Sequence, residues 1–286
     1  MPSSLRSRSC PPPAAESLPL TVRVLCRVRH RVLRTMGAAL FGLGLWTVAA
    51  LVVEALRGIP FPTPWDCLLE LCRLLGGATF LEFTLYEHVG ASCLRWLVGF
   101  LLACAMAVTY AGLALASPLF RSVSLPTVEV LQLIPGLAWV PVAILLFGLG
   151  QTATVSIIVL TTFPVLALSV LMGFSCTDRD LVRVGRMCGC TGSDLFRTVY
   201  LPSALSHLLS GLRLGVGASW RVLIAAEMVT GSGEGLGFAI IQSRWTMDYV
   251  AAFACIAVIA VIGLCLERCL FLPLERHTLR RWRGEA

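Results

Sequence analysis

The chain has 286 residues, of which 57% are hydrophobic and only 14% charged, and its mean hydropathy is +0.83. A soluble domain carries about 25% charged residues, so this composition excludes an ordinary soluble domain and predicts a chain that uses lipid as its solvent. All 23 basic residues are arginine. A P-loop needs a lysine on the nucleotide phosphates and a Schiff-base enzyme needs a lysine amine, so we expect neither chemistry in this chain.

Six apolar runs approach or reach the length of about 20 residues that crosses a hydrocarbon core of about 30 Å. Backbone groups in lipid must be paired within the segment, so such runs form helices. The sequence therefore predicts an all-α polytopic membrane protein. We place its six spans at 38–56, 94–116, 128–150, 152–174, 205–229 and 250–272.

The N-terminal segment 1–37 is a basic arm with seven arginines and a Pro-Pro-Pro at 11–13. Basic segments of this kind are attracted to an anionic membrane leaflet. The apolar run that follows is too long for a signal peptide and lacks a clean small-x-small cleavage site. We expect an arm without a fold of its own, and Met36 is an alternative start of the protein.

The loop after the first span, within segment 38–93, begins with three prolines and then has leucines at helical spacing from Leu68 to Leu75. One interpretation is an amphipathic helix that lies on the outer membrane surface. A helix that packs on the bundle and covers it is the alternative.

The third span contains IPGLAWVPVAILLFGLG at 134–150, with two internal prolines, Pro135 and Pro141. Each proline removes an i→i−4 hydrogen bond, which is tolerated in a membrane where neighbours or a cavity satisfy the freed carbonyl. We expect a kinked helix that lines a translocation pathway; a kink that serves packing alone is the alternative.

The loop between the fourth and fifth spans predicts a helix, a break and a second helix. Asp178 or Thr177 can cap the first helix, which ends at Gly189. Ser193 offers a second N-cap, and Pro202 is expected to end that second helix. A short amphipathic helix on the cytoplasmic face suits a groove in a partner protein.

The fifth span carries charges within the membrane. Gly211, Gly215 and Ser219 form a small-xxx-small face that lets helices approach closely. Arg221 falls near the bilayer middle and Glu227 toward the outer end. Six residues turn a helix by about 600°, so these two side chains point about 120° apart and each needs another partner. Because a charge at the membrane centre costs about 2.5–3.5 kcal/mol on insertion scales, we take both as candidate pathway residues; a structural ion pair with another helix is the alternative.

The arginines also predict the orientation of the chain, because cytoplasmic loops are rich in basic residues. Sixteen arginines lie on the side of the two termini, and the loops on the opposite side hold only three. Both termini are therefore expected in the cytoplasm. The basic segments on that side are 1–37, 117–127, 175–203 and 273–286.

No pattern in the sequence indicates a catalytic or metal site. Cysteine pairs such as Cys188/Cys190 lack the second pair or the histidines that a zinc site needs, and the four histidines are scattered. An intramembrane lipid-modifying enzyme, which needs such a cluster, is one alternative function. A secondary transporter is another, but it would show inverted repeats and broken helices in matching halves.

The string RVGRMCGCTGSDLFRTVYLP at 183–202 resembles the cytoplasmic EAA loop of permease subunits from binding-protein-dependent type I ABC importers, most closely their nitrate/sulfonate/taurine branch. Gly189 stands thirteen residues before Pro202, as in that loop. Where the family usually has Glu-Ala-Ala, this chain has Arg183, Val184 and Gly185. IPGLAWVPVAILLFGLG, GLRLGVGASWRVLIAAEM and GSGEGLGFAIIQSRW resemble further strings of the same branch, in the same order.

The resemblance implies a MetI-like fold with a permease core at 94–272, a coupling loop at 175–203 and a basic tail at 273–286. Leu195 is expected on the face that enters the ATPase groove. The implied coupling residues are Arg183, Val184, Gly185, Gly189, Ser193, Leu195, Leu201 and Pro202. The candidate pathway residues are Pro135, Pro141, Arg221 and Glu227.

The resemblance also implies the partners: an ABC ATPase subunit, an extracytoplasmic solute-binding protein, a second permease copy and membrane lipid, with no nucleic acid. No cofactor is expected on this chain, because ATP and magnesium would bind the ATPase. The protein would lie in the bacterial inner membrane. The substrate stays open, since this branch carries nitrate, sulfonates, taurine, bicarbonate-like anions, thiamine precursors and flavins.

Overall fold

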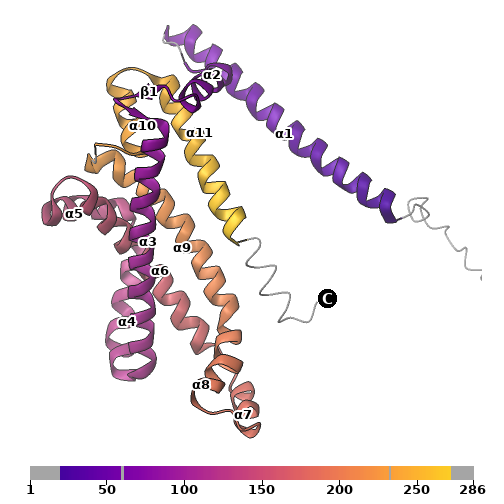
Figure 1. Cartoon of the computed structure of the whole chain (residues 1–286), viewed down its shortest axis with the longest axis vertical. Coiled ribbons are helices and arrows are strands. Elements are labelled where there is room, and N and C mark those ends of the chain that lie inside the picture. Colours follow the sequence, from indigo (N-terminus) through magenta and orange to yellow (C-terminus); the bar gives the residue numbers. More distant parts are fainter. Residues whose placement is uncertain (1–19, 59–60, 232, 272–286) are drawn as a thin grey trace, which may run out of the picture. The chain divides into compact units, whose positions relative to one another are not determined.

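The computed structural model describes residues 20–58, 61–231 and 233–271. The chain divides into two compact units, residues 1–64 and 65–286, and each unit is described by itself. The tail 273–286 and residues 1–19 of the predicted arm lie outside the described residues. Figure 1 shows the helices coloured along the chain.

The first unit contains α1, a helix of 38 residues from Leu20 to Arg57. Its stretch Met36–Leu56 is apolar enough to cross a membrane, with mean hydropathy 2.0, as predicted for the first span. The expectation that segment 1–37 has no fold of its own is wrong from Leu20 onward. No glycine or proline occurs between Leu20 and Gly37, so nothing in the sequence ends the helix before its arginine-rich part.

The second unit begins with the helix α2, Pro64–Leu75, and a hairpin of two short antiparallel strands, β1 (Thr79–Phe80) and β2 (Phe83–Thr84). Both interpretations of the predicted amphipathic helix find support in α2. Leu74 is fully buried in the core of this unit, whereas Trp65 is exposed. The helix therefore packs on its neighbours and still presents an apolar face outward.

The helix α3, Leu85–Ala116, starts nine residues before the predicted span at Leu94. A capping box fixes this start: Glu87 N donates to Thr84 Oγ1 at 3.3 Å, and Thr84 N donates to the Glu87 carboxylate at 2.6 Å. The first turns of α3 carry polar side chains such as His88, which resemble loop residues in the sequence but are buried. The predicted outer loop is therefore shorter than expected.

The predicted third span is a broken helix pair, bent by 104°, instead of one kinked helix. The break lies at Pro135. Proline disfavours the helical conformation of the residue before it, and Ile134 has an extended backbone with ψ 121°; Pro135 itself cannot donate a backbone hydrogen bond. Pro141 lies in the first turn of the second helix, where no intrahelical donor is needed. The pair consists of α4 (Pro118–Leu133), the 3-10 turn η1 (Gly136–Trp139) and α5 (Val140–Phe147).

Within the described residues, five helices are long and apolar enough to cross a membrane, or six if the bent pair counts as one span. This agrees with the prediction of about six spans and an all-α fold. The remaining elements are α6 (Gln151–Ser175), α7 (Arg179–Met187), α8 (Gly192–Leu195), the π turn η2 (Phe196–Tyr200), α9 (Leu201–Thr230), α10 (Leu236–Trp245), α11 (Tyr249–Cys265) and the π turn η3 (Leu266–Phe271).

The core of the second unit forms where α6 packs against both α3 and α9. The small-residue face of α9 is part of this contact, as predicted. An added Cβ on Gly215 would lie 2.7 Å from Leu166 Cδ2, so the two helices approach more closely than a larger side chain would allow. Ser219 accepts a hydrogen bond from Trp96 Nε1 of α3 at 2.8 Å. The small face therefore fixes α9 against both neighbours.

Candidate coupling loop and charged sites

The helix α7 confirms the first half of the predicted loop. Asp178 is its N-cap, and the Asp178 carboxylate accepts a hydrogen bond from Asp180 N at 2.9 Å. The chain leaves the helix at Gly189, whose φ of +85° is the left-handed conformation that glycine adopts without strain. At the opposite end of the second unit from α10, α7 and α8 form a compact hairpin (Figure 1).

The second half of the prediction is wrong. Thr191 instead of Ser193 occupies the N-cap of α8, and its side chain makes no capping hydrogen bond. Pro202 does not end a helix, because it lies in the first turn of α9. The π turn η2 makes this possible: Leu201 N donates to Phe196 O, five residues back, and a new α-helical register then starts with the proline where no donor is required. Residues 192–230 therefore form one continuous helical segment of 39 residues.

Gly185 stands at the last position of the Arg-Val-Gly triplet and explains how α7 packs on α8 and η2. An added Cβ on Gly185 would lie 2.8 Å from Leu195 Cδ1 and 3.0 Å from Val199 Cγ2. Leu195 is buried. The expectation that Leu195 enters a partner's groove is therefore wrong, because Leu195 holds the two halves of the loop together.

A different face of α7 points away from the chain. Leu181, Val184 and Met187 have exposed fractions of 52%, 51% and 79%. Their spacing of three residues places them within one face about 120° wide. Arg183 lies beside this face and pairs with Asp180 at 2.9 Å, where both side chains are exposed, so this ion pair contributes little to stability. An exposed apolar face rimmed by charge is typical of a protein-interaction surface.

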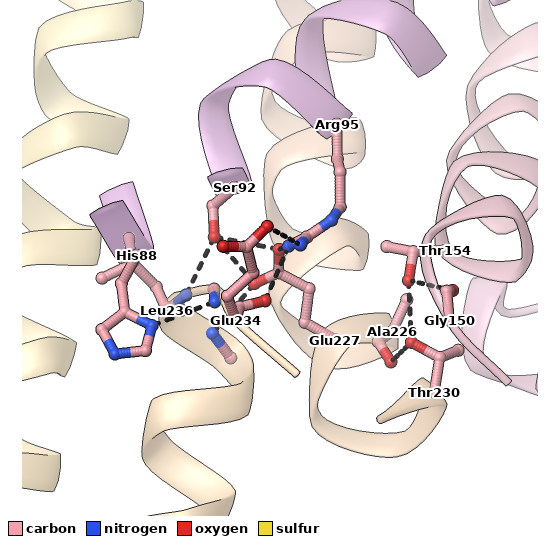
Figure 2. Close-up of polar contacts among 12 residues, drawn as sticks. His88, Ser92, Arg95, Gly150, Thr154, Ala226, Glu227, Thr230, Glu234 and Leu236 are labelled. Carbon is pink, nitrogen blue, oxygen red and sulfur yellow. Dashed lines mark hydrogen bonds and ion pairs between the residues drawn. The ribbon is translucent and has the colours of Figure 1, made fainter. Parts of the chain in front are cut away.

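Glu227 of α9 lies in a buried polar cluster at the other end of the second unit (Figure 2). Arg95 of α3 donates from Nη1 to Glu227 Oε1 at 2.7 Å, and the two side chains are 4% and 0% exposed. Ser92 Oγ lies 2.8 Å from Glu227 Oε2 and donates to the carboxylate. Glu227 is therefore buried within this chain. It forms an ion pair with another helix, which was the alternative to a pathway role.

The same cluster holds the start of α10 by its backbone. Gly235 N donates to His88 Nδ1 at 3.0 Å, Leu236 N donates to Ser92 Oγ at 2.9 Å, and Gly237 N donates to Glu227 Oε2 at 3.0 Å. Since Nδ1 of His88 accepts, its Nε2 carries the proton and donates to a carbonyl of the hairpin. A Cβ on Gly235 (φ +128°) would lie 2.7 Å from the Glu227 carboxylate, so this loop position requires glycine.

A pair of threonines closes the neighbouring side of the same region (Figure 2). Thr154 Oγ1 of α6 lies 2.7 Å from Thr230 Oγ1 of α9, and Gly150 N donates to Thr230 O at 2.9 Å. The end of α9 is therefore tied to both α3 and α6.

Sequence reasoning missed Arg95, Ser92 and His88. The predicted span began at Leu94, which placed Arg95 at a membrane edge where an arginine needs no explanation. In the structure Arg95 lies in the third turn of α3. The available signal was Glu227 itself, because an intramembrane carboxylate needs a basic partner and Arg95 is the one arginine within the predicted second span.

Arg221 differs from Glu227 in both its exposure and its contacts. Its side chain is exposed, and no described residue forms a hydrogen bond or ion pair with it. It lines a groove of about 480 Å³ between α9 and α11, together with Trp220, Arg213 and Glu267. The structure therefore does not bring Arg221 and Glu227 into one site.

Of the two candidate prolines, Pro135 lies at the break that brings η1 onto the core. Gly136, next to Pro135, packs so closely on α6 that an added Cβ would lie 2.7 Å from Thr161 Oγ1. Pro141 is exposed in the first turn of α5.

No group of three or more histidine, cysteine or carboxylate side chains in the described ranges could hold a metal ion. The described cysteines are free, including Cys67 and Cys72. Cys67 is buried, which raises the pKa of its thiol above the ordinary value and makes it a poor nucleophile.

The chain is similar to known transport proteins. Residues 97–270 match the model of a family described as "binding-protein-dependent transport system inner membrane component". The taurine transport system permease protein TauC of Escherichia coli K12 is 32% identical over 242 residues, which cover 84% of this chain and 86% of that protein. A nitrate import permease protein, NrtB of Leptolyngbya laminosa, is 29% identical over 203 residues, 71% of each chain. A solved structure of the inward-facing MetNI methionine ABC transporter aligns with a TM-score of 0.47 at 18% identity, over 70% of this chain and 94% of that one.

Proposed function

Because the chain belongs to the family of inner membrane components of binding-protein-dependent transport systems, we propose that it is the permease subunit of an ABC importer for a small anionic solute. The multi-pass helical fold supports a role in the membrane. The names of its relatives, which specify taurine and nitrate transport, support a solute with an anionic group. The best support for coupling to an ATPase comes from the exposed apolar face of α7, formed by Leu181, Val184 and Met187.

The energy source would be a separate ATPase, since this chain has no lysine for a P-loop. ATP and magnesium would bind that ATPase and not the permease. α7 would sit in a groove of the ATPase, and closure of the ATPase dimer would move α7 and the helix 192–230 that follows it. A second copy of the permease would complete the translocation pathway, and a solute-binding protein would deliver the solute from the outer side.

The distribution of charge supports an orientation with α7 on the cytoplasmic side. Arg179, Arg183, Arg186 and Arg197 all lie in the loop formed by α7, α8 and η2, and basic loops stay in the cytoplasm. In this orientation α7 would lie on the side where an ATPase works. The buried Arg95–Glu227 cluster would then lie at the outer end of the permease.

The competing interpretations have less support. A lipid-modifying enzyme would need a cluster of catalytic side chains, and the polar cluster at Glu227 is buried with its groups engaged with one another. A secondary transporter would be expected to have a second broken helix in the matching half of the chain, and the one bent pair among the described helices is α4 with η1 and α5.

The test is to place a charge on the exposed face of α7. We expect Val184→Glu to abolish co-purification of the ATPase, because a buried unpaired carboxylate at an interface is strongly unfavourable. Thr191→Glu, an exposed change in the turn between α7 and α8, is the matched control. Both variants should elute from size exclusion as the wild type does. Retention of the ATPase and of solute uptake by Val184→Glu would exclude this face as the coupling surface.

A further inference from the structure

The groove between α9 and α11 combines two arginines with apolar walls. It has a volume of about 480 Å³, and Leu214, Ile259 and Leu264 supply part of its apolar lining. Arg213 and Arg221 both project into it from α9. They are eight residues apart, which corresponds to about 12 Å along the helix axis. The groove is thus long enough to hold a small molecule at either arginine or between them.

Arg221 occupies the membrane part of the groove without a counter-charge. No described residue pairs with its guanidinium, and its side chain leans over Gly217, where Nη1 would lie 3.7 Å from an added Cβ. Gly217 contacts no neighbouring helix closely, in contrast to Gly211 and Gly215 on the other face of α9. An arginine at membrane depth that has no partner within its protein requires water or an anion. The structure leaves room for both.

Arg213, at the other end of the groove, has a counter-charge that can be displaced. Arg213 Nη2 lies 2.6 Å from Glu267 Oε1 of η3, and the two side chains are 54% and 51% exposed. An ion pair exposed to this extent is weak. A soluble anion can therefore compete with the Glu267 carboxylate for the guanidinium.

We propose that this groove is an anion-binding track, in which a small oxyanion with a short apolar body binds first to Arg221 and then to Arg213 by displacing Glu267. The inference rests on the proposed function and names the substrate class of the pathway. A guanidinium binds a planar or tetrahedral oxyanion through two parallel hydrogen bonds, and the apolar body of the solute lies against the walls formed by α9 and α11. A sulfonate or carboxylate on a chain of two or three carbons meets both requirements.

Direct binding to the purified permease complex in nanodiscs tests the track without transport. The probe is propane-1-sulfonate, and neutral propane-1-sulfonamide is its control. Trp220 lines the groove, so binding is followed by the part of the tryptophan fluorescence that Trp220→Phe removes. We expect saturable binding of the sulfonate, at least tenfold weaker binding to Arg221→Gln, and no saturable binding of the sulfonamide. Equal binding to wild type and Arg221→Gln overturns the proposal.

Two further variants test the groove even if Arg221→Gln fails to fold. Glu267→Gln removes the competing carboxylate and is expected to tighten sulfonate binding, whereas Arg213→Gln is expected to weaken it. Arg244→Gln, on α10 outside the groove lining, should bind as the wild type does. If both single variants, Glu267→Gln and Arg213→Gln, bind the sulfonate as the wild type does, the second step of the track is wrong.

A lipid headgroup has the same anionic chemistry, so the nanodiscs are prepared with phosphatidylcholine or with phosphatidylglycerol. If phosphatidylglycerol stabilises the wild type but not Arg221→Gln, and the sulfonate does not bind in either lipid, the groove is a lipid site and the solute proposal is wrong. ATPase co-purification and ATP hydrolysis are measured on the same samples. A complex that assembles and hydrolyses ATP but binds no sulfonate overturns the track and leaves the proposed function intact.

Discussion

At the scale of single residues, the buried pair Arg95–Glu227 shows how a charge is held inside the membrane part of the chain. The carboxylate accepts hydrogen bonds from a guanidinium, a hydroxyl and a backbone N–H. Arg95 also donates to Glu234 O at 2.8 Å. The donors to the carboxylate come from α3 and from the first turn of α10, so the cluster joins these two helices to α9. Removing one member of the pair should therefore lower stability by more than the loss of a single hydrogen bond.

We expect Arg95→Leu to lower the free energy of unfolding by about 3–5 kcal/mol, because it leaves the Glu227 carboxylate buried without a counter-charge. The double variant Arg95→Leu/Glu227→Leu should recover part of that loss, since both charges are then absent. Thermal unfolding in detergent, followed by size exclusion, measures the effect.

Arg244→Leu, which removes an exposed arginine of α10, is the control and should unfold at the wild-type temperature. A single variant Arg95→Leu as stable as the wild type would show that the cluster does not hold the fold. A double variant less stable than the single one would show that the pair is strongly favourable on its own.

At the scale of elements, the hairpin of α7 and α8 depends on the missing side chain of Gly185. Leu195 Cδ1 fills the space that a Cβ would occupy. This contact seats α7 on α8 and η2. A change at Gly185 should therefore alter the interaction surface without altering a residue on it.

We expect Gly185→Leu to separate α7 from α8 at a cost of about 1–3 kcal/mol from overpacking, and to reduce ATPase co-purification. Gly185→Leu/Leu195→Ala should restore both, because the smaller Leu195 replacement makes room. Limited proteolysis of the loop reports the separation.

Gly112→Ala, at a helical glycine of α3 with no atom within 4 Å of an added Cβ, serves as the control and should have no effect. If Gly185→Leu leaves both proteolysis and co-purification unchanged, the close contact at Gly185 is not needed for the hairpin.

Features that depend on neighbouring residues could be predicted from the sequence, whereas features that depend on contacts between distant residues could not. The cap of α7, for which Asp178 was one of two candidates, and the end of that helix at Gly189 depend on neighbouring residues and were predicted. The start of α3 at Leu85 was not, because its first turns carry buried polar residues that resemble a loop. The pairing of Arg95 with Glu227 joins positions 132 residues apart, and no local pattern encodes it. The 104° bend follows from Pro135, but proline alone does not set its size.

At the scale of the whole second unit, the two ends differ in chemistry. One end carries the arginine-rich loop of α7, α8 and η2, and the other carries α10, the hairpin and the buried cluster (Figure 1). Charge asymmetry of this kind sets the orientation of a membrane protein.

We expect Ser193→Cys, in a background without reactive cysteines, to resist an impermeant maleimide in intact cells and to react in inverted vesicles. Thr246→Cys, an exposed position after α10, is the matched control and should show the opposite pattern. Labelling is detected by mass shift. Reaction of Ser193→Cys in intact cells would reverse the orientation and place α7 outside the reach of an ATPase.

The continuous helical segment 192–230 has a mechanical consequence. Its 39 residues correspond to about 58 Å at 1.5 Å per residue, with the π turn near one end and the buried carboxylate of Glu227 near the other. Apart from the register change at η2, the segment is continuous, so a push along its axis or a tilt reaches its far end. A displacement applied at the hairpin of α7 and α8 therefore reaches Arg221 in its groove and the Glu227 anchor in the same motion. A movement of about 1.5 Å, the rise of one helical residue, would shift both positions together.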